Sequence, residues 1–211
     1  MSFYTNVCRY GNTILYRGYN NHGKRIYKRD TEFKPVFFTE TSKQSQWKSL
    51  DGRNIGAVIQ PSMRDAKEWL ERNKNVSGKK IFGNAKYLQQ YITHKFPREI
   101  EFRREFIDVG TFDIETEYDD GFPEPAEANQ RILSITYKSS KSKLYHVWGY
   151  GEFDTEKSLI QPVRYYRCRD EVSLLTKFLD FWSDPDKTPD VITGWNTRFF
   201  DVPYLINRTQ K

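Results

Sequence analysis

The sequence has little cysteine and no long apolar segment. Its two cysteines, Cys8 and Cys168, form no Cys-x-x-Cys pair and have no histidine pair nearby. This excludes a typical zinc site or disulfide framework and favours a reducing cytoplasm. No apolar run approaches the roughly 18 residues that suggest a membrane helix. The first residues also lack the basic and then apolar pattern of a signal peptide. We therefore expect a protein that does not cross a membrane.

Aromatic and charged residues are plentiful instead. The 211 residues include 14 Tyr, 15 Phe and 5 Trp, enough for one large domain or two small domains with real cores. Lys and Arg number 34 against 28 Asp and Glu, giving a net charge of +6. The basic excess lies in the first half, in runs such as residues 22–29 and 77–82. This is compatible with a nucleic-acid partner, although such runs are also ordinary solvated surface.

The first half reads as a small α+β domain, for which we expect residues 1–105. Apolar and polar residues predict strands in 3–38, with a hairpin turn at residues 20–23. Residues 39–60 look polar and irregular. Ser62 and Asp65 predict a helix start of the capping-box kind. A strand over 79–84 and a second helix over 85–96 complete this half.

The second half, residues 106–211, predicts strands, a helix, a further strand and a final helix. We expect strands over 106–116, 131–139 and 143–150, with an extended piece over 163–168. Asp170 is a plausible N-cap for the next helix. The apolar face of that helix is expected from the spacing of Val172, Leu175, Phe178, Leu179 and Trp182. A short strand then leads to a helix that begins near Asp201.

The stretch FDIET, residues 112–116, carries two carboxylates inside an otherwise typical strand. Side chains alternate along a strand, so Asp113 and Glu115 share a face. Two ionised carboxylates side by side repel unless a cation lies between them. A hard divalent ion such as Mg²⁺ or Mn²⁺ would relieve this, and a pair of ions can assist phosphodiester hydrolysis. The alternative is the solvent-facing edge of a half-buried strand.

A second motif, TGWNTRFFDVPYLINR, covers residues 193–208. Its short apolar strand ends at Asn196, and Asp201 opens a helix with Pro203 in the first turn, where proline is favoured. Asp201 could serve only as an N-cap. Taken with Asp113 and Glu115, it predicts that a sheet brings three carboxylates to one cleft.

Together these residues resemble the family B DNA polymerases of T-even-type bacteriophages. FDIET is similar to the first exonuclease motif, Asp-x-Glu, and GWNTRFFDVPYLINR to the second, Asn-x(2-3)-Phe/Tyr-Asp. The loop DGFPEP, residues 120–125, and the helix with SMRDAKEWL extend the resemblance over essentially the whole chain. It implies a small α+β N-terminal domain and a partial ribonuclease-H-like exonuclease domain with a mixed sheet. It also implies the cytoplasm of an infected bacterial host.

The resemblance assigns roles to six residues. Asp113, Glu115 and Asp201 would be the metal-ligating and catalytic carboxylates of a 3′–5′ proofreading site that uses two Mg²⁺ or Mn²⁺ ions. Three further residues would bind the single-stranded DNA 3′ end, namely Phe122, Asn196 and Phe200. Structural roles remain open for these three: Phe200 as a core residue, Asn196 as the end of a strand, and Phe122 as a loop anchor.

The sequence departs from the family pattern after Asp201. No third motif, Tyr-x(3)-Asp, follows it before Lys211, and the polymerase motifs Asp-x-x-Ser-Leu-Tyr and Tyr-x-Asp-Thr-Asp are absent. We expect an incomplete exonuclease domain that is not a polymerase by itself. The chain would be either a truncated piece or a natural N-terminal part of a polymerase encoded in pieces. In both cases we expect the remaining polymerase segment and primer–template DNA as partners.

Two other functions remain open. The basic, aromatic first half suggests a single-stranded nucleic-acid-binding module without catalysis, which would bind equally well after Asp113→Ala. A purely structural assembly piece would show neither strong DNA binding nor metal binding without its partner.

Overall fold

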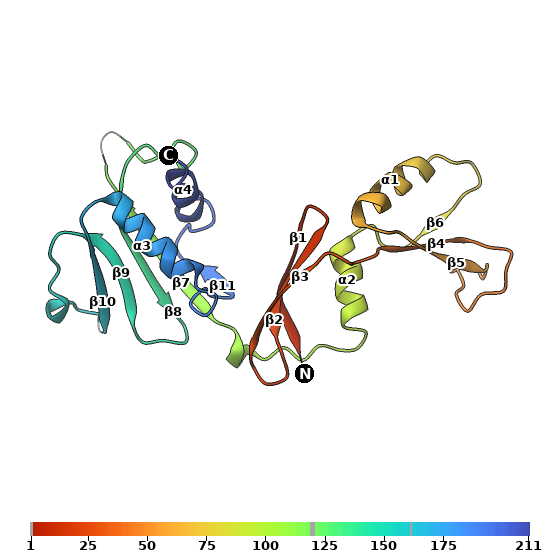
Figure 1. Cartoon of the computed structure of the whole chain (residues 1–211), viewed down its shortest axis with the longest axis horizontal. Coiled ribbons are helices and arrows are strands. Elements are labelled where there is room, and N and C mark those ends of the chain that lie inside the picture. The colour runs from red at the N-terminus through yellow and green to blue at the C-terminus, as the bar shows by residue number, and fades with distance from the viewer. Residues whose placement is uncertain (1, 119–120, 161) are drawn as a thin grey trace. The chain divides into compact units, whose positions relative to one another are not determined.

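The chain forms two compact units, Met1–Phe106 and Ile107–Lys211. The computed structural model, shown in Figure 1, describes residues 2–118, 121–160 and 162–211. Each unit has its own cluster of buried apolar side chains. Within the described ranges, no helix has the length and apolar character needed to cross a membrane.

The first unit begins with an antiparallel meander of β1 (Phe3–Tyr10), β2 (Thr13–Tyr19) and β3 (Arg25–Asp30). The predicted hairpin turn joins β2 to β3. The Asn20 side chain accepts hydrogen bonds from the backbone N–H groups of His22 and Lys24, both at 2.9 Å. Gly23 adopts a φ of +74°, which a glycine tolerates without steric cost.

A second sheet in this unit was not predicted in full. It contains β4 (Val36–Glu40), β5 (Ile55–Ile59) and β6 (Ile81–Phe82) in the order β5-β4-β6. The prediction that residues 39–60 are irregular is therefore wrong for β5 and the end of β4. The strand expected over 79–84 is only two residues long. Strands this short have too little alternation to be read from sequence, and pairing with β4 defines them.

Two helices complete the first unit, α1 (Met63–Asn73) and α2 (Tyr87–Lys95). The predicted cap of α1 is confirmed, because Ser62 Oγ accepts a hydrogen bond from Asp65 N at 3.1 Å. The core joins β2 to both helices through Ile14, Tyr16, Met63 and Tyr91.

The second unit is built on a five-stranded mixed sheet in the order β10-β9-β8-β7-β11. Its strands are β7 (Val109–Thr116), β8 (Ile132–Ser139), β9 (Tyr145–Tyr150), β10 (Val163–Cys168) and β11 (Val191–Thr193). The pairs β7·β8 and β8·β9 are antiparallel, whereas β10 runs parallel to β9 and β11 runs parallel to β7. The predicted mixed sheet is confirmed. A short 3₁₀ turn, η2 (Thr155–Lys157), lies outside this sheet, and another, η1 (Arg104–Phe106), ends the first unit.

Helices α3 (Glu171–Ser183) and α4 (Asp201–Arg208) contribute to the core of this sheet. Asp170 caps α3 as predicted, since its Oδ1 accepts a hydrogen bond from Ser173 N at 2.8 Å. The predicted apolar face of α3 is partly wrong. Leu174 and Phe178 are the buried residues, whereas Val172 and Leu179 are exposed. The helix packs against β8, β9 and β10 with the predicted Phe178 and with Leu174, which the spacing did not single out; the predicted Leu175 and Trp182 also pack against the core.

Candidate active site

Strand β7 places the two carboxylates of FDIET on one exposed face. Phe112 and Ile114 are buried in the core, whereas Asp113 and Glu115 are exposed. The shared face predicted from strand alternation is therefore observed. The buried residues hold β7 in place, so the two acids project from a fixed backbone.

Asp201 binds the edge of the same strand. Strand β11 pairs with β7 only as far as Thr193. Beyond that point, Asp201 Oδ1 accepts a hydrogen bond from Ile114 N at 3.1 Å. Thr197 Oγ1 donates to the Phe112 carbonyl oxygen at 3.5 Å. Side chains of the second motif thus replace the backbone hydrogen bonds that a longer β11 would supply.

Gly194 permits this close approach. A Cβ atom at this position would lie 2.1 Å from Thr197 Oγ1 and 2.4 Å from the Phe112 carbonyl oxygen. Both distances are far too short for a real contact. A residue without a side chain is therefore needed where the chain leaves β11.

The charges of Asp113 and Glu115 act on the carboxyl group of Asp201. Asp201 is only 2% exposed, and burial raises its pKa above the ordinary value. The hydrogen bond from Ile114 N opposes this, while the negative charges of Asp113 and Glu115 raise the pKa further. Asp201 Oδ2 is buried and has no hydrogen-bond partner among the described residues. An unsatisfied carboxylate oxygen beside two acids fits a proton or a cation.

The carboxylates do not form a closed metal site. Over the described ranges, no group of three His, Cys, Asp or Glu side chains is arranged to hold a metal ion. The charges of Asp113 and Glu115 are thus near enough to raise the pKa of Asp201. The three carboxylates are nevertheless not arranged as ligands of one metal ion. Their roles as metal ligands stay a prediction.

The structure decides between the two interpretations of Asp201. Helix α4 begins at Asp201 with Phe200 as its N-cap residue, and no side-chain cap hydrogen bond is present there. The Asp201 side chain bonds β7 instead. The alternative that Asp201 serves only as an N-cap is therefore wrong.

Phe122 and Phe200, the two aromatic residues predicted to contact DNA, contact each other. The rings of Phe122 and Phe200 lie 4.9 Å apart between centroids, at 48°. Phe122 is 78% exposed, whereas Phe200 is half-buried and also contacts Tyr204. The loop after β7 and the start of α4 thus present a joint aromatic surface near Asp201.

Asn196 has a clear backbone role. Its φ is +58°, a conformation that Asn tolerates better than most residues. Its carbonyl oxygen accepts hydrogen bonds from Phe199 N and Phe200 N, both at 2.9 Å. Asn196 therefore shapes the turn that leads into α4, and its predicted contact with DNA stays a prediction.

The same turn carries exposed aromatic residues that the sequence motifs did not single out. Trp195 is 93% exposed, Phe199 is also exposed, and the Arg198 guanidinium lies 5.4 Å from the centroid of the Phe199 ring. The available signal was three aromatics within the six residues WNTRFF. A strand or helix would bury most of them, so their density in a turn indicates a contact surface.

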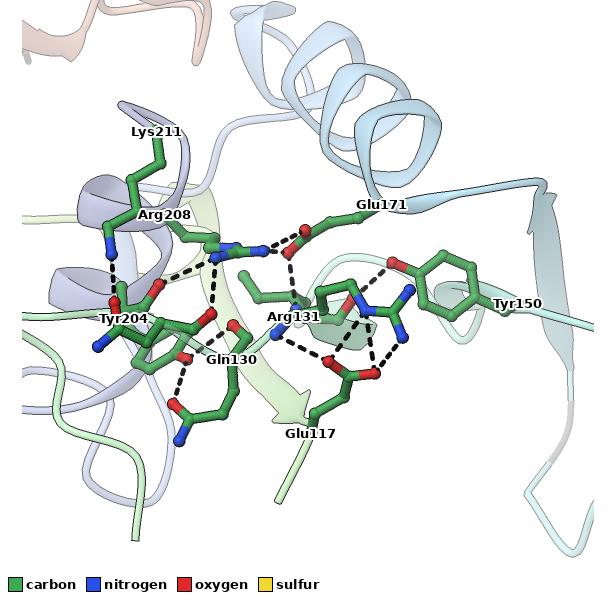
Figure 2. Close-up of polar contacts among 11 residues, drawn as sticks. Glu117, Gln130, Arg131, Tyr150, Glu171, Tyr204, Arg208 and Lys211 are labelled. Carbon is green, nitrogen blue, oxygen red and sulfur yellow. Dashed lines mark hydrogen bonds and ion pairs between the residues drawn. The ribbon is translucent and has the colours of Figure 1, made fainter. Parts of the chain in front are cut away.

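A largely buried ion pair connects the loop after β7 to both helices, as Figure 2 shows. Arg208 of α4 donates two hydrogen bonds to Glu171 of α3, at 2.8 and 2.6 Å. Arg208 also donates to the carbonyl oxygens of Ala128 and Asn129. Glu171 accepts a third bond from Ile132 N at 2.8 Å. These bonds therefore connect the loop to both α3 and α4.

Further hydrogen bonds extend this attachment along α4. Tyr204 donates through its hydroxyl to the Gln130 carbonyl oxygen at 2.8 Å (Figure 2). Asn207 donates to the Pro125 carbonyl oxygen at 2.8 Å. Arg131 and Glu117 form an ion pair across the two ends of the loop. The loop that carries Phe122 is thus held against the helix that carries Asp201.

Two Tyr-x(3)-Asp sequences occur before the second motif, Tyr150–Asp154 and Tyr166–Asp170. Both aspartates accept hydrogen bonds from backbone N–H groups at the start of the next helical turn. They act as caps on elements that precede Asp201, so neither takes the place of a third motif after it.

A comparison with protein-family models identifies the chain. Residues 65–211 match the model described as DNA polymerase family B, exonuclease domain. The chain belongs to this family. Both exonuclease-like motifs, FDIET and GWNTRFFDVPYLINR, lie inside the matched region. The predicted family B resemblance is therefore confirmed.

Phage family B polymerases match over almost the whole chain. The DNA-directed DNA polymerase of Enterobacteria phage T4 is 29% identical over 99% of this chain. That of Escherichia phage RB69 is 30% identical over 98% of it. The chain spans only 25% of the length of each relative.

A solved family B structure shares the fold. The DNA polymerase of the archaeon Pyrobaculum calidifontis aligns with a TM-score of 0.62 and 18% identity, covering the whole chain and 31% of the archaeal protein. At this identity the match supports the fold alone. The mixed sheet of the second unit fits the ribonuclease-H-like fold expected for a family B exonuclease domain.

Proposed function

We propose that this chain is the N-terminal part of a phage-type family B DNA-directed DNA polymerase that acts in DNA replication. Residues 1–105 would be its N-terminal domain, and residues 106–211 would be part of its 3′–5′ proofreading exonuclease domain. One observation supports this most directly. Asp201 bonds Ile114 N beside the two acids of FDIET, within the region that matches the exonuclease family model.

The three carboxylates are the proposed divalent-metal ligands. Asp113 and Glu115 offer exposed oxygens from one face of β7, and Asp201 offers its unbonded Oδ2. Bound Mg²⁺ or Mn²⁺ would activate water and stabilise the charged oxygens of a phosphodiester undergoing hydrolysis. The Ile114 N–H fixes Asp201 Oδ1, which leaves Oδ2 as the free ligand atom.

The aromatic surface is proposed to hold the DNA 3′ end. Phe122 and Phe200 offer touching rings to an unpaired terminal base, with Asn196 shaping the turn beside them. Stacking on aromatic rings tolerates every base, as a proofreading site requires. Trp195 and Phe199 extend this surface on the same turn.

The partners and location follow from the same proposal. The chain would act together with the remaining polymerase segment, on primer–template DNA and its single-stranded 3′ end. Its location would be the cytoplasm of an infected bacterial host, away from any membrane.

Metal binding tests this proposal without relying on activity. We would titrate Mn²⁺ into the wild-type chain and follow free Mn²⁺ by electron paramagnetic resonance. Asp113→Ala and Asp201→Asn should each weaken the site at least tenfold. The control variant Asp186→Asn removes an exposed acid from the same unit and should bind like wild type. Equal binding by all four proteins would contradict the proposed site.

A nuclease assay then separates complete from partial catalysis. We would incubate 5′-labelled single-stranded DNA with Mg²⁺, with Mn²⁺ or with chelator. Metal-dependent shortening from the 3′ end by wild type, but not by Asp113→Ala, would make the chain a self-sufficient exonuclease. Intact DNA with the Mn²⁺ site present would make it one part of the exonuclease site. Intact DNA without any Mn²⁺ site would favour the non-catalytic binding or assembly module.

A further inference from the structure

The turn between β11 and α4, residues 194–200, is attached to β7 and is here called the α4 turn. Within it, the Thr197 hydroxyl donates a hydrogen bond to the Phe112 carbonyl oxygen. Directly after it, the Asp201 carboxylate accepts one from Ile114 N. Both bonds reach the strand that carries the two acids of FDIET. The α4 turn is therefore held beside the proposed carboxylate site.

Three large side chains of the α4 turn are exposed. Trp195 is 93% exposed and Phe199 is 71% exposed, and Arg198 is exposed as well. The Arg198 guanidinium lies 5.4 Å from the centroid of the Phe199 ring. The ring attracts the guanidinium group, whose N–H donors stay available to another partner. The turn thus presents a positioned cation together with two flat rings.

Arg198 differs from most arginines of the second unit, because no described carboxylate pairs with it. This unit contains six arginines. Four of them form ion pairs, namely Arg131–Glu117, Arg167–Glu152, Arg169–Asp170 and Arg208–Glu171. Within the described ranges, Arg164 and Arg198 do not, and Arg164 lies on β10, at the opposite edge of the sheet from β11. Arg198 is therefore the unpaired arginine on the side of the sheet where Asp201 lies.

The charge around Arg198 indicates what this cation can bind. Residues 107–211 contain 13 Lys and Arg against 18 Asp and Glu, and the proposed site itself consists of three acids. A DNA strand is a polyanion, so the net charge of this unit opposes its approach. A guanidinium group is always charged and can bind two oxygens of one phosphate. Arg198 therefore offers a phosphate contact next to acids that repel the strand.

We propose that Arg198 binds one backbone phosphate of the single strand whose 3′ end lies at Asp113, Glu115 and Asp201. The inference rests on the proposed exonuclease function and adds a DNA contact that needs no divalent ion. Trp195 and Phe199 stack on neighbouring bases, and Phe199 also positions the guanidinium group. DNA binding at the α4 turn is therefore separable from metal binding at the carboxylates.

Trp195 provides a reporter within the α4 turn itself. The chain has five tryptophans, each of which gives one indole N–H signal in NMR spectra of ¹⁵N-labelled protein. The variant Trp195→Phe identifies the signal of Trp195. We would titrate tetrathymidylate into the full chain in the presence of chelator and follow this signal. The buried Trp148 shows that each variant is folded, and the half-exposed Trp47 reports on binding at the first unit.

Three substitutions separate the phosphate contact from general charge. Arg198→Gln removes the charge and Arg198→Lys keeps it, whereas the matched control Arg164→Gln removes an exposed, unpaired arginine elsewhere in the unit. We expect Arg198→Gln to weaken binding at Trp195 roughly fivefold or more, with a smaller loss for Arg198→Lys and binding within about twofold of wild type for Arg164→Gln. Between about 50 and 200 mM salt, the slope for Arg198→Gln should be shallower by about 0.7, which corresponds to one phosphate.

Uncharged linkages identify the phosphate that Arg198 contacts. Each internucleotide phosphate of tetrathymidylate can be replaced in turn by a methylphosphonate. We expect one replacement to weaken binding to wild type roughly fivefold or more, while binding to Arg198→Gln stays within about twofold. A merely structural role for Arg198 would not couple it to one linkage.

Three results would overturn this inference. Tetrathymidylate could leave the Trp195 signal unshifted. Arg198→Gln could bind like wild type, or no single linkage could show the coupling. Polyglutamate could shift the Trp195 signal with the same affinity as tetrathymidylate, which would make the α4 turn a docking surface for acidic protein segments.

Mn²⁺ binding keeps a failure of this inference apart from a failure of the proposed function. Arg198→Gln should bind Mn²⁺ at least as tightly as wild type, because it removes a positive charge and no ligand. If wild type binds Mn²⁺ but Arg198→Gln leaves DNA binding unchanged, only the phosphate contact is wrong. If wild type binds no Mn²⁺, the exonuclease function is wrong, whatever the effect of Arg198→Gln on DNA.

Discussion

The Asp201 carboxyl group is stabilised by one interaction and destabilised in its charged form by another. Its Oδ1 satisfies a backbone N–H of β7, while its burial beside Asp113 and Glu115 raises its pKa. A neutral amide, as in asparagine, would accept the same hydrogen bond without the repulsion from the neighbouring acids. The charged residue is therefore better explained by the ligand it is proposed to hold than by stability.

Substitutions at Asp201 should separate its two roles. Asp201→Asn keeps an acceptor for Ile114 N, whereas Asp201→Ala leaves that buried N–H without a partner. We expect the Ala variant to be less stable than the Asn variant by about 1–3 kcal/mol. Urea unfolding monitored by circular dichroism measures this difference. Equal stability of the two variants would show that the hydrogen bond contributes nothing.

His146 gives the second unit a pH-dependent stability. Its ring lies beside the stacked rings of Trp148 and Tyr166, 6.0 and 5.9 Å from their centroids, and its Nδ1 lies 3.0 Å from the Tyr166 hydroxyl. Burial lowers its pKa, and the charges of Arg164 and Lys187 lower it further. The native state thus takes up a proton less readily than the unfolded chain. His146 contributes stability above its ordinary pKa of about 6.5, and this contribution is lost as the pH falls through the lowered native pKa.

Removing the titrating group should flatten this dependence. Between about pH 7 and pH 5 we expect wild type to lose more stability than His146→Phe, by about 1.4 kcal/mol for each unit by which the native pKa is lowered. Thermal unfolding across this range provides the measurement. The control His94→Gln changes an exposed histidine and should leave the profile unchanged. Parallel curves for wild type and His146→Phe would rule out this role.

At the scale of elements, the loop after β7, α3 and α4 are joined through one ion pair. Glu171 and Arg208 are both largely buried, and the bond to Glu171 raises the pKa of Arg208. Removing one partner leaves a buried charge, whereas removing both does not. The pair therefore holds the Phe122 loop and the Asp201 helix in a fixed relation.

A double-mutant cycle measures this connection. We expect Glu171→Gln or Arg208→Met alone to cost about 3 kcal/mol, and the double variant to cost less than the sum of the two. The exposed pair Arg64–Glu68 serves as the control and should contribute no more than about 0.5 kcal/mol. Strictly additive losses in urea unfolding would mean that the ion pair does not couple the two helices.

At the scale of the whole molecule, the two units have separate cores and opposite charge. Ile14 belongs to the core of the first unit, and Ile135 to that of the second. Net positive charge lies in the first unit and net negative charge in the second. The two units thus differ in the sign of the net charge that each presents to a ligand.

Core substitutions should report on the units one at a time. Ile135→Ala and Ile14→Ala should each destabilise their own unit by about 2–5 kcal/mol. Differential scanning calorimetry should then show a different transition moving in each variant. A single transition that shifts equally in both would show that the units unfold together.

Local patterns predicted the features that depend on neighbouring residues. The caps at Ser62 and Asp170, the shared face of Asp113 and Glu115, and the helix that begins at Asp201 were all predicted in this way. The pairing and packing of segments that are distant in the sequence were not predicted. Strand β5 forms only by pairing with β4, and the buried line of α3 is chosen by the sheet beneath it.

The sequence by itself determined the two carboxylate motifs and the family to which they belong, because alternation, capping and motif spacing are local properties. Only the tertiary structure decided what Asp201 does. It bonds Ile114, which lies 87 positions earlier in the chain, because β11 ends early and leaves the edge of β7 open.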